Sequence, residues 1–393
     1  MTMTKIKGPK KHYFFLIIFL SIIIILNGCI SNVQEEYKNS KDKKIKIALL
    51  LPISSKDNNL SRLGKSLRDA AFLAKQDLAN NFLEIRTYDT YGINQKGILA
   101  YKLALEEKNE IIVGPFLSSV TMEISNQFPF NSVNILSLSD DPTIVGRKIF
   151  ILGDTVVNRA NNLIQYAMNN KKYRFALIGP VRDNSNKISS LISNKILMNR
   201  GTVTFTSYYS DDISAISDLA QEIKNKIIQT NTDVVIFTGK PDKRMAHLAA
   251  ELADITVNKI NKGIQIMGLN HWENSASILS EPALQKAWFT MPDQRFRSFY
   301  ENKFINKFGY IPHPKSNLAY DAVASLGVLH KNLTNNENDY FDKFNGLFNR
   351  NGFIGIDGIF RFNNDRIAEK ELSIIELISG KPKMLKQAKS RFQ

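Results

Sequence analysis

The chain has 393 residues, with 52 Lys or Arg against 37 Asp or Glu, and its formal net charge is +15. A chain of this length exceeds what one hydrophobic core usually supports, so we expect at least two lobes. The basic residues are scattered rather than interleaved with aromatics in one segment, which argues against nucleic acid as a partner.

Residues 1–28 have the three parts of a secretory signal peptide: a basic start, an apolar run from Tyr13 to Leu26, and a small residue before Cys29. The run is shorter than the roughly 20 residues of a membrane span. Cys29 is the only cysteine, and Leu26-Asn27-Gly28-Cys29 resembles a lipobox. This resemblance implies a lipoprotein acylated at Cys29 and exported from the cytoplasm. The alternative is an uncleaved anchor with an incidental cysteine.

Residues 29–44 are polar and charged, which is typical of a flexible tether. Ile30 lacks the aspartate that retains many enteric lipoproteins in the inner membrane, so we expect a lipid-anchored protein at the periplasmic face, in the outer rather than the inner membrane. Two basic clusters either are simply solvated or attract anionic lipid or polymer; they comprise Lys41, Lys43, Lys44 and Lys46, and Lys381, Lys383, Lys386, Lys389 and Arg391.

From Ile45 onward, short β-branched runs alternate with helical periods, for example the apolar face of 63–78. This alternation predicts parallel sheets covered by helices on both faces. The pattern restarts after 150–154, which predicts two α/β lobes. The expected strands are 46–51, 83–88, 110–113, 133–136, 174–178, 202–206, 233–237 and 264–267.

Catalytic and metal-binding motifs are missing from the sequence. There is no Walker A pattern, no G-x-S-x-G elbow and no H-E-x-x-H. The adjacent carboxylates Asp140-Asp141 and Asp211-Asp212 are most simply helix caps. We therefore expect no enzyme, no cofactor and no metal site; a hydrolase using cleft carboxylates is the weaker hypothesis.

A ligand site is better supported, because ligands of doubly wound sheets lie beyond the carboxyl ends of the strands. One expected strand runs through Gly114-Pro115 into Ser118 and Ser119, which either cap the next helix or contact ligand. The same two alternatives hold for Ser137, Ser139 and Asp140 after the next strand, and for Asp89 at the end of 83–88. Trp272 either walls the cleft between the two lobes or belongs to the core.

Several stretches resemble the type I periplasmic-binding (Leu/Ile/Val-binding-like) superfamily: IKIALLLPISSKDNNLSRLGKSLRDAAFLAKQDL at 45–78, IRTYDTYG at 85–92, IIVGPFLSSV at 111–120, VNILSLSDD at 133–141 and LAYDAV at 318–323. The opening pattern, YDT and GPF look most like penicillin-binding protein activators, lipoproteins proposed to stimulate peptidoglycan synthases.

The resemblance implies a two-lobed fold with three crossovers. Lobe 1 would contain 45–155 and 288–340, and lobe 2 would contain 156–287 and 341–393. The hairpin at 353–362 would complete lobe 2. Ser118 matches a serine that holds the carboxylate in related amino-acid receptors, whereas Asp140 and Asp141 replace a threonine segment and would repel a carboxylate.

The leading hypothesis is therefore a non-catalytic, lipid-anchored regulator of cell-wall synthesis with a peptidoglycan synthase as partner. The alternative is the substrate-binding receptor of an ABC transporter, holding an amino acid or similar small polar solute in the interlobe cleft.

Overall fold

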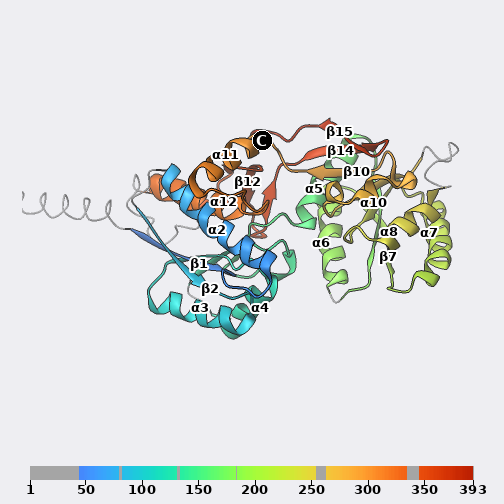
Figure 1. The fold of residues 1–393 in the computed structure, drawn as a ribbon. Helices are drawn as coiled ribbons and strands as arrows, with labels where there is room; N and C mark the ends of the chain where they lie inside the picture. Colours follow the sequence, from blue (N-terminus) through green and yellow to red (C-terminus); the bar gives the residue numbers. More distant parts are fainter. Residues whose placement is uncertain are drawn as a thin grey trace, which may run out of the picture.

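The computed structural model describes residues 44–78, 82–130, 133–182, 184–253, 263–333 and 345–392. Two lobes lie side by side in it, each built around a β-sheet (Figure 1). The expected signal peptide, most of the tether and Cys29 lie outside the described residues. Within them, no helix combines the length and apolar character needed to cross a membrane.

Lobe 1 contains a five-stranded sheet in the order β2-β1-β3-β4-β5, and all its pairings are parallel. Except for β2 at one edge, its strands are buried along almost their whole length, as a sheet covered on both faces requires. The strands are β1 (Ile45–Leu51), β2 (Leu83–Asp89), β3 (Ile111–Val113), β4 (Asn134–Ser137) and β5 (Ile149–Ile151).

Helices cover both faces of this sheet. The helices α2 (Asn58–Asp77) and α12 (Asn317–Leu333) pack on one face, with Leu67, Ala71 and Ala322 in the shared core. The helices α3 (Asn94–Glu106) and α4 (Ser118–Gln127) cover the other face. Helix α11 (Arg297–Phe308) packs outside α2. The apolar face expected for 63–78 is thus confirmed, although the helix begins earlier.

Lobe 2 contains a seven-stranded sheet in the order β15-β14-β10-β9-β8-β6-β7. This sheet is mixed rather than purely parallel, because β14 runs antiparallel to both β10 and β15. The strands are β6 (Arg174–Pro180), β7 (Thr202–Tyr209), β8 (Val234–Phe237), β9 (Gln265–Gly268), β10 (Trp288–Met291), β14 (Ser373–Ile378) and β15 (Lys381–Lys386). Its helices are α5 (Val156–Asn169), α6 (Ser185–Met198), α7 (Ile216–Thr230), α8 (Lys243–Glu251) and the short α10 (Ala276–Leu279).

A third, antiparallel sheet of β11 (Phe353–Gly355), β12 (Gly358–Phe362) and β13 (Ala368–Lys370) packs on lobe 1. Phe362 makes an edge contact with Phe150, with ring centroids 5.5 Å apart. Two segments therefore differ from the expected lobe boundaries. The strand at 288–291 pairs within the lobe 2 sheet, and the hairpin at 353–362 buries its aromatic side chains in lobe 1.

The chain passes between the lobes three times within the described residues: after β5, after β10 and after β13. Helix α5 contacts each passage. Asn158 Oδ1 accepts from Lys370 N at 2.9 Å, and Asn162 Oδ1 accepts from Leu372 N at 3.1 Å. Arg159 donates to Thr290 O at 2.9 Å. The predicted two-lobed fold with three crossovers is confirmed.

Asp321 lies buried beside the third sheet, with 4% of its surface exposed. Its Oδ1 accepts a hydrogen bond from Ile356 N at 2.9 Å. Burial raises the pKa of Asp321 to about 7, and the hydrogen bond from Ile356 and the charge of Lys370 offset this only in part. The folded protein thus keeps a proton that the unfolded chain releases near pH 4.

We expect the contribution of Asp321 to the free energy of unfolding to fall as pH rises from about 4 to 7, because the folded state binds the extra proton. Asp321→Asn removes this titration, so its stability relative to the native chain should grow by on the order of 2 kcal/mol between pH 4.5 and pH 8. Urea unfolding at both pH values measures the difference. Asp365→Asn, on an exposed carboxylate paired with Lys195, is the control. If the free energy of unfolding of Asp321→Asn differed from that of the native chain by the same amount at both pH values, the raised pKa of Asp321 would be contradicted.

Candidate functional site

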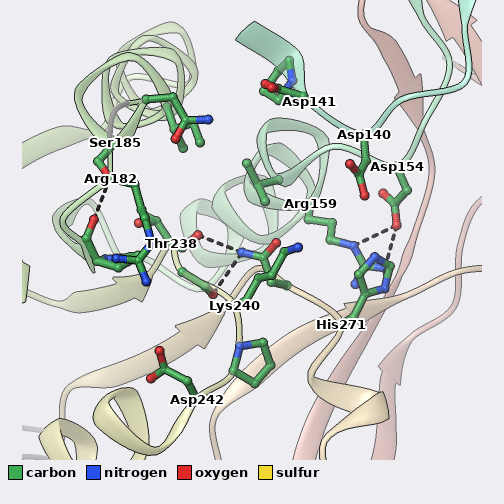
Figure 2. Close-up of a pocket in the computed structure, with 18 of the residues that line it drawn as sticks. Asp140, Asp141, Asp154, Arg159, Arg182, Ser185, Thr238, Lys240, Asp242 and His271 are labelled. Atoms are coloured by element: carbon green, nitrogen blue, oxygen red, sulfur yellow. Dashed lines mark hydrogen bonds and ion pairs between the residues drawn. The ribbon is translucent and has the colours of Figure 1, made fainter. Parts of the chain in front are cut away.

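A cleft of about 820 Å³ lies between the lobes, at the carboxyl ends of the strands of both sheets. Lobe 1 contributes Ser118, Asp140 and Lys315, and lobe 2 contributes residues that follow β6, β8 and β9. Figure 2 shows several of the lining side chains. Charged and polar residues of both signs dominate it, including Asp141, Asp154, Arg159, Arg182, Ser185, Thr238, Lys240, Asp242, Arg244, Asn270 and His271.

Arg159 and Asp154 form a buried ion pair at the wall of this cleft. Arg159 is 1% exposed, and its Nε and Nη2 lie 2.8 and 2.6 Å from Asp154 Oδ2. Nη2 also lies 2.9 Å from His271 Nδ1, whose ring contacts Glu273 at 3.1 Å. Since Nη1 donates to Thr290, the guanidinium is engaged on every nitrogen by the protein itself.

Two carboxylates beside this guanidinium remain ionised. Burial would raise the pKa of Asp154, but the charges of Arg159, Lys370 and His271 outweigh it, so its pKa is lowered. Burial likewise opposes ionisation of Glu273, yet the hydrogen bond from His271 and the charge of Arg159 lower its pKa. Among the described residues, Asp154 Oδ1 and Glu273 Oε2 are buried oxygens without a hydrogen-bond partner. They are acceptors that nothing in the described protein uses.

The N-terminus of α4 faces the cleft from lobe 1. Gly114 (φ +95°) makes the turn before it, and a Cβ there would lie 2.4 Å from Leu50 O. The cap residue is Leu117, which gives the helix no side-chain cap. Ser118 therefore sits inside the first turn rather than capping it, contrary to the capping alternative. The free N–H groups of this turn favour a negative charge in front of them.

Lobe 2 presents the start of α6 and a charged rim. The cap residue of α6, Asn184, makes no side-chain cap bond, and Ser185 lines the cleft. Arg182 and Arg244 both pair with Asp211, Arg182 at 3.1 Å. In Figure 2, Arg182, Ser185 and Asp242 lie across the cleft from Asp140, Asp154 and Arg159.

The candidate residues from the sequence separate into two groups. Ser118 and Asp140 line the cleft, and Asp140 Oδ2 lies 3.1 Å from Lys315 Nζ. Asp141 caps the 3-10 turn Pro142–Ile144, as its capping role predicted. Ser119 is exposed but does not line the cleft.

The other candidates have structural roles in the described protein. Ser137 is fully buried and donates to Pro115 O at 3.1 Å, while Ser139 accepts from Asp141 N at 3.1 Å. Asp89 accepts from Ser54 N and Tyr91 N and so holds two loops together. Trp272 is buried against Phe289, as its core alternative predicted.

Sequence reasoning did not select Asp154, Arg159 or His271. Asp154 carried a usable signal, because it comes shortly after an apolar strand, as Asp140 does. Arg159 and His271 carried none, since their contacts join residues more than 100 positions apart. Among the described residues, no cluster of three or more His, Cys, Asp or Glu could hold a metal ion.

Comparison with known proteins identifies the fold as that of the type I periplasmic binding proteins. A branched-chain amino acid ABC transporter protein of Rhodospirillum rubrum matches with a TM-score of 0.67 and 14% identity, over 87% of this chain and 100% of that one. An ABC transporter substrate-binding protein of Desulfitobacterium hafniense in complex with Leu matches with a TM-score of 0.58 and 14% identity, over 87% and 100% of the two chains.

In sequence, the chain is 26% identical over 379 residues to an uncharacterized protein of Rickettsia prowazekii (strain Madrid E). The match covers 93% of this chain and 96% of that protein. No protein-family model matches.

We expect Arg159→Met to lower the free energy of unfolding by about 3–5 kcal/mol, because it leaves the carboxylate of Asp154 buried without its counter-charge. Urea denaturation measures the loss, and the double variant Arg159→Met/Asp154→Asn should recover part of it. Arg182→Met is the matched control: its side chain is 49% exposed, and the cost should stay below about 1 kcal/mol. A loss for Arg159→Met no larger than for the control would refute the role of the pair.

Proposed function

We propose that the chain is an exported solute-binding protein that holds a small polar ligand between its lobes. The single observation that carries this proposal is the interlobe cleft, which is lined by the uncapped start of α4 and by the carboxylates of Asp140 and Asp242. Its volume of about 820 Å³ falls in the range of small-molecule sites.

The donors favour an anionic group on the ligand. The first turn of α4 offers unpaired N–H groups and the Ser118 hydroxyl, and the first turn of α6 lies on the opposite wall. Helix N-termini bind carboxylate and phosphate groups through these N–H groups and the helix dipole. Arg159 does not contribute, because Asp154 and Thr290 already engage all three of its nitrogens.

The acceptors favour a cationic group on the same ligand. Asp140 and Asp154 stand beyond neighbouring strands, β4 and β5. Arg159 compensates the charge of Asp154, whereas Asp140 is paired with Lys315 but stays half exposed at the cleft. We infer a zwitterionic solute, such as an amino acid or a short peptide, held without chemical conversion.

We also propose that the protein is a lipoprotein anchored through Cys29, at the periplasmic face and in the outer rather than the inner membrane. The lipobox-like Leu26-Asn27-Gly28-Cys29 behind a basic and apolar segment supports the anchor. Two or more acyl chains would make the membrane attachment stable.

A penicillin-binding protein activator is the second candidate function. The sequence motifs YDT and GPF with the following serines favour it. In that case a peptidoglycan synthase would bind the outer surface, and the cleft would need no ligand. The two candidates are separated by whether any solute stabilises the protein.

We expect at least one zwitterionic solute to raise the Tm of the chain by several degrees, because a ligand at 100 times its Kd adds about 2.7 kcal/mol of stability. Thermal-shift assays with amino acids, short peptides and muropeptides measure this. Ser118→Ala should weaken binding about tenfold or more, since it removes a hydrogen bond to a charged group. Ser119→Ala is the control, as Ser119 lies outside the cleft lining. The absence of a shift with every solute, together with binding to a purified peptidoglycan synthase, would favour the activator instead.

We expect Cys29→Ser to abolish incorporation of radiolabelled palmitate during expression in bacteria and to release the protein from the membrane fraction. Lipid attachment requires the thiol, and the variant keeps every described residue unchanged. Membrane retention of the native chain without any incorporated label would show that the N-terminal segment is an uncleaved anchor.

A further inference from the structure

The edge of the lobe 1 sheet opposite the cleft carries exposed apolar side chains. All five strands are parallel, so their amino ends share this edge. Phe130, in the loop before β4, is 92% exposed; Phe82 precedes β2 and is 37% exposed; Leu78 ends α2 and is 36% exposed. We call this edge, with Lys44, Leu78, Phe82, Lys108, Phe130 and Arg147, the amino-edge face. Phe130 lines a small hollow there with Phe128 and Ile149, and apolar groups gathered on a surface are typical of an interaction site.

The amino-edge face is also basic. Lys44, Lys108 and Arg147 are exposed there, and Arg147 and Lys148 line a small hollow together with Phe128 and Phe130. Several acidic side chains at this edge already form ion pairs or hydrogen bonds within the protein. Arg86 pairs with Glu84 and Glu107 at 2.9 and 2.7 Å, and Glu110 accepts from Lys46 N at 3.4 Å. Glu106 is an exposed acid at the same edge. The accessible charge is therefore mainly positive beside apolar groups.

The chain enters the described fold at this same face. Lys44 is the first described residue, and β1 begins at the end of lobe 1 away from lobe 2 (Figure 1). Residues 30–43 separate Lys44 from Cys29, the proposed site of lipid attachment. Even fully extended, this stretch reaches only about 50 Å. A membrane that holds the N-terminal segment would therefore meet this face before any other.

We propose that the amino-edge face docks on the surface of a bilayer with anionic headgroups. The inference rests on the proposed lipid anchor, which raises the local lipid concentration so that a few contacts suffice. The exposed cations would contact headgroup phosphates, and Phe130 would insert at the interface, where aromatic side chains prefer to lie. Lipid fits better than an extended protein partner, because the chemistry is cationic and apolar and the entry of the chain sets the geometry.

The test uses the full chain, acylated and reconstituted into vesicles of phosphatidylcholine and phosphatidylglycerol. Phe130→Trp places a fluorophore on the face, and lipids brominated on the acyl chain quench it on contact. The native Trp272 and Trp288 are buried in lobe 2 and give a constant background. Met198→Trp, at a side chain 76% exposed on α6 of lobe 2, is the matched control.

We expect quenching of Phe130→Trp at least twofold stronger than that of Met198→Trp. The difference should vanish in pure phosphatidylcholine vesicles, and in the triple variant that adds Lys44→Glu and Arg147→Glu. Thermal melting shows that each variant is folded.

Vesicle flotation separates the two proposals. A chain that floats with the vesicles but is quenched equally at both positions would overturn the docking and leave the anchor intact. A chain that does not float would overturn both. A blue-shifted emission of Phe130→Trp without quenching would assign the face to a protein contact, and so would also overturn lipid docking.

Discussion

The ion pair between Arg159 and Asp154 fixes the start of α5 at the point where the two lobes meet. Both charges are removed from water, which is costly unless each is fully paired and hydrogen-bonded. Arg159 meets that condition through Asp154 and Thr290, which belong to two separate segments. Because Asn158 and Asn162 of the same helix bind the third passage between the lobes, one helix holds all three. Polar contacts of α5 therefore help to fix the relative position of the lobes.

This arrangement determines what the cleft offers to a ligand. A free buried guanidinium would dominate the potential of the cleft, but the protein neutralises it with an ionised carboxylate. The remaining attraction for an anion comes from backbone N–H groups at the starts of α4 and α6, which are fixed by the fold. The donors therefore need no rearrangement when a ligand arrives, which lowers the cost of binding. Carboxylates on the adjacent wall add a region of negative charge to the cleft.

The sequence predicted local structure well and distant packing poorly. Buried strands such as 111–113 and the capping role of Asp141 depend on near neighbours, so periodicity and residue type sufficed. The hairpin at 353–362 was assigned to the wrong lobe, because its aromatic residues pack on Phe150, some 200 positions earlier. The same limit applies to the candidate site. Ser118 and Asp140 follow strands and were recognisable. Arg159 lies at the site because it contacts Thr290 and His271, which are distant in the sequence, and no local pattern indicates these contacts.

The two ends of the parallel sheet of lobe 1 carry different kinds of side chain. The carboxyl ends of its strands carry the polar groups of the cleft, and the amino ends carry Phe130 and the exposed cations of the amino-edge face. Helix dipoles reinforce this separation, since the helices return antiparallel to the strands and present their N-termini to the cleft. Contacts at the amino edge therefore leave the cleft accessible to solutes. Lobe 2, joined through α5, stays free of such contacts, so lobe closure over a ligand would not compete with attachment at a membrane.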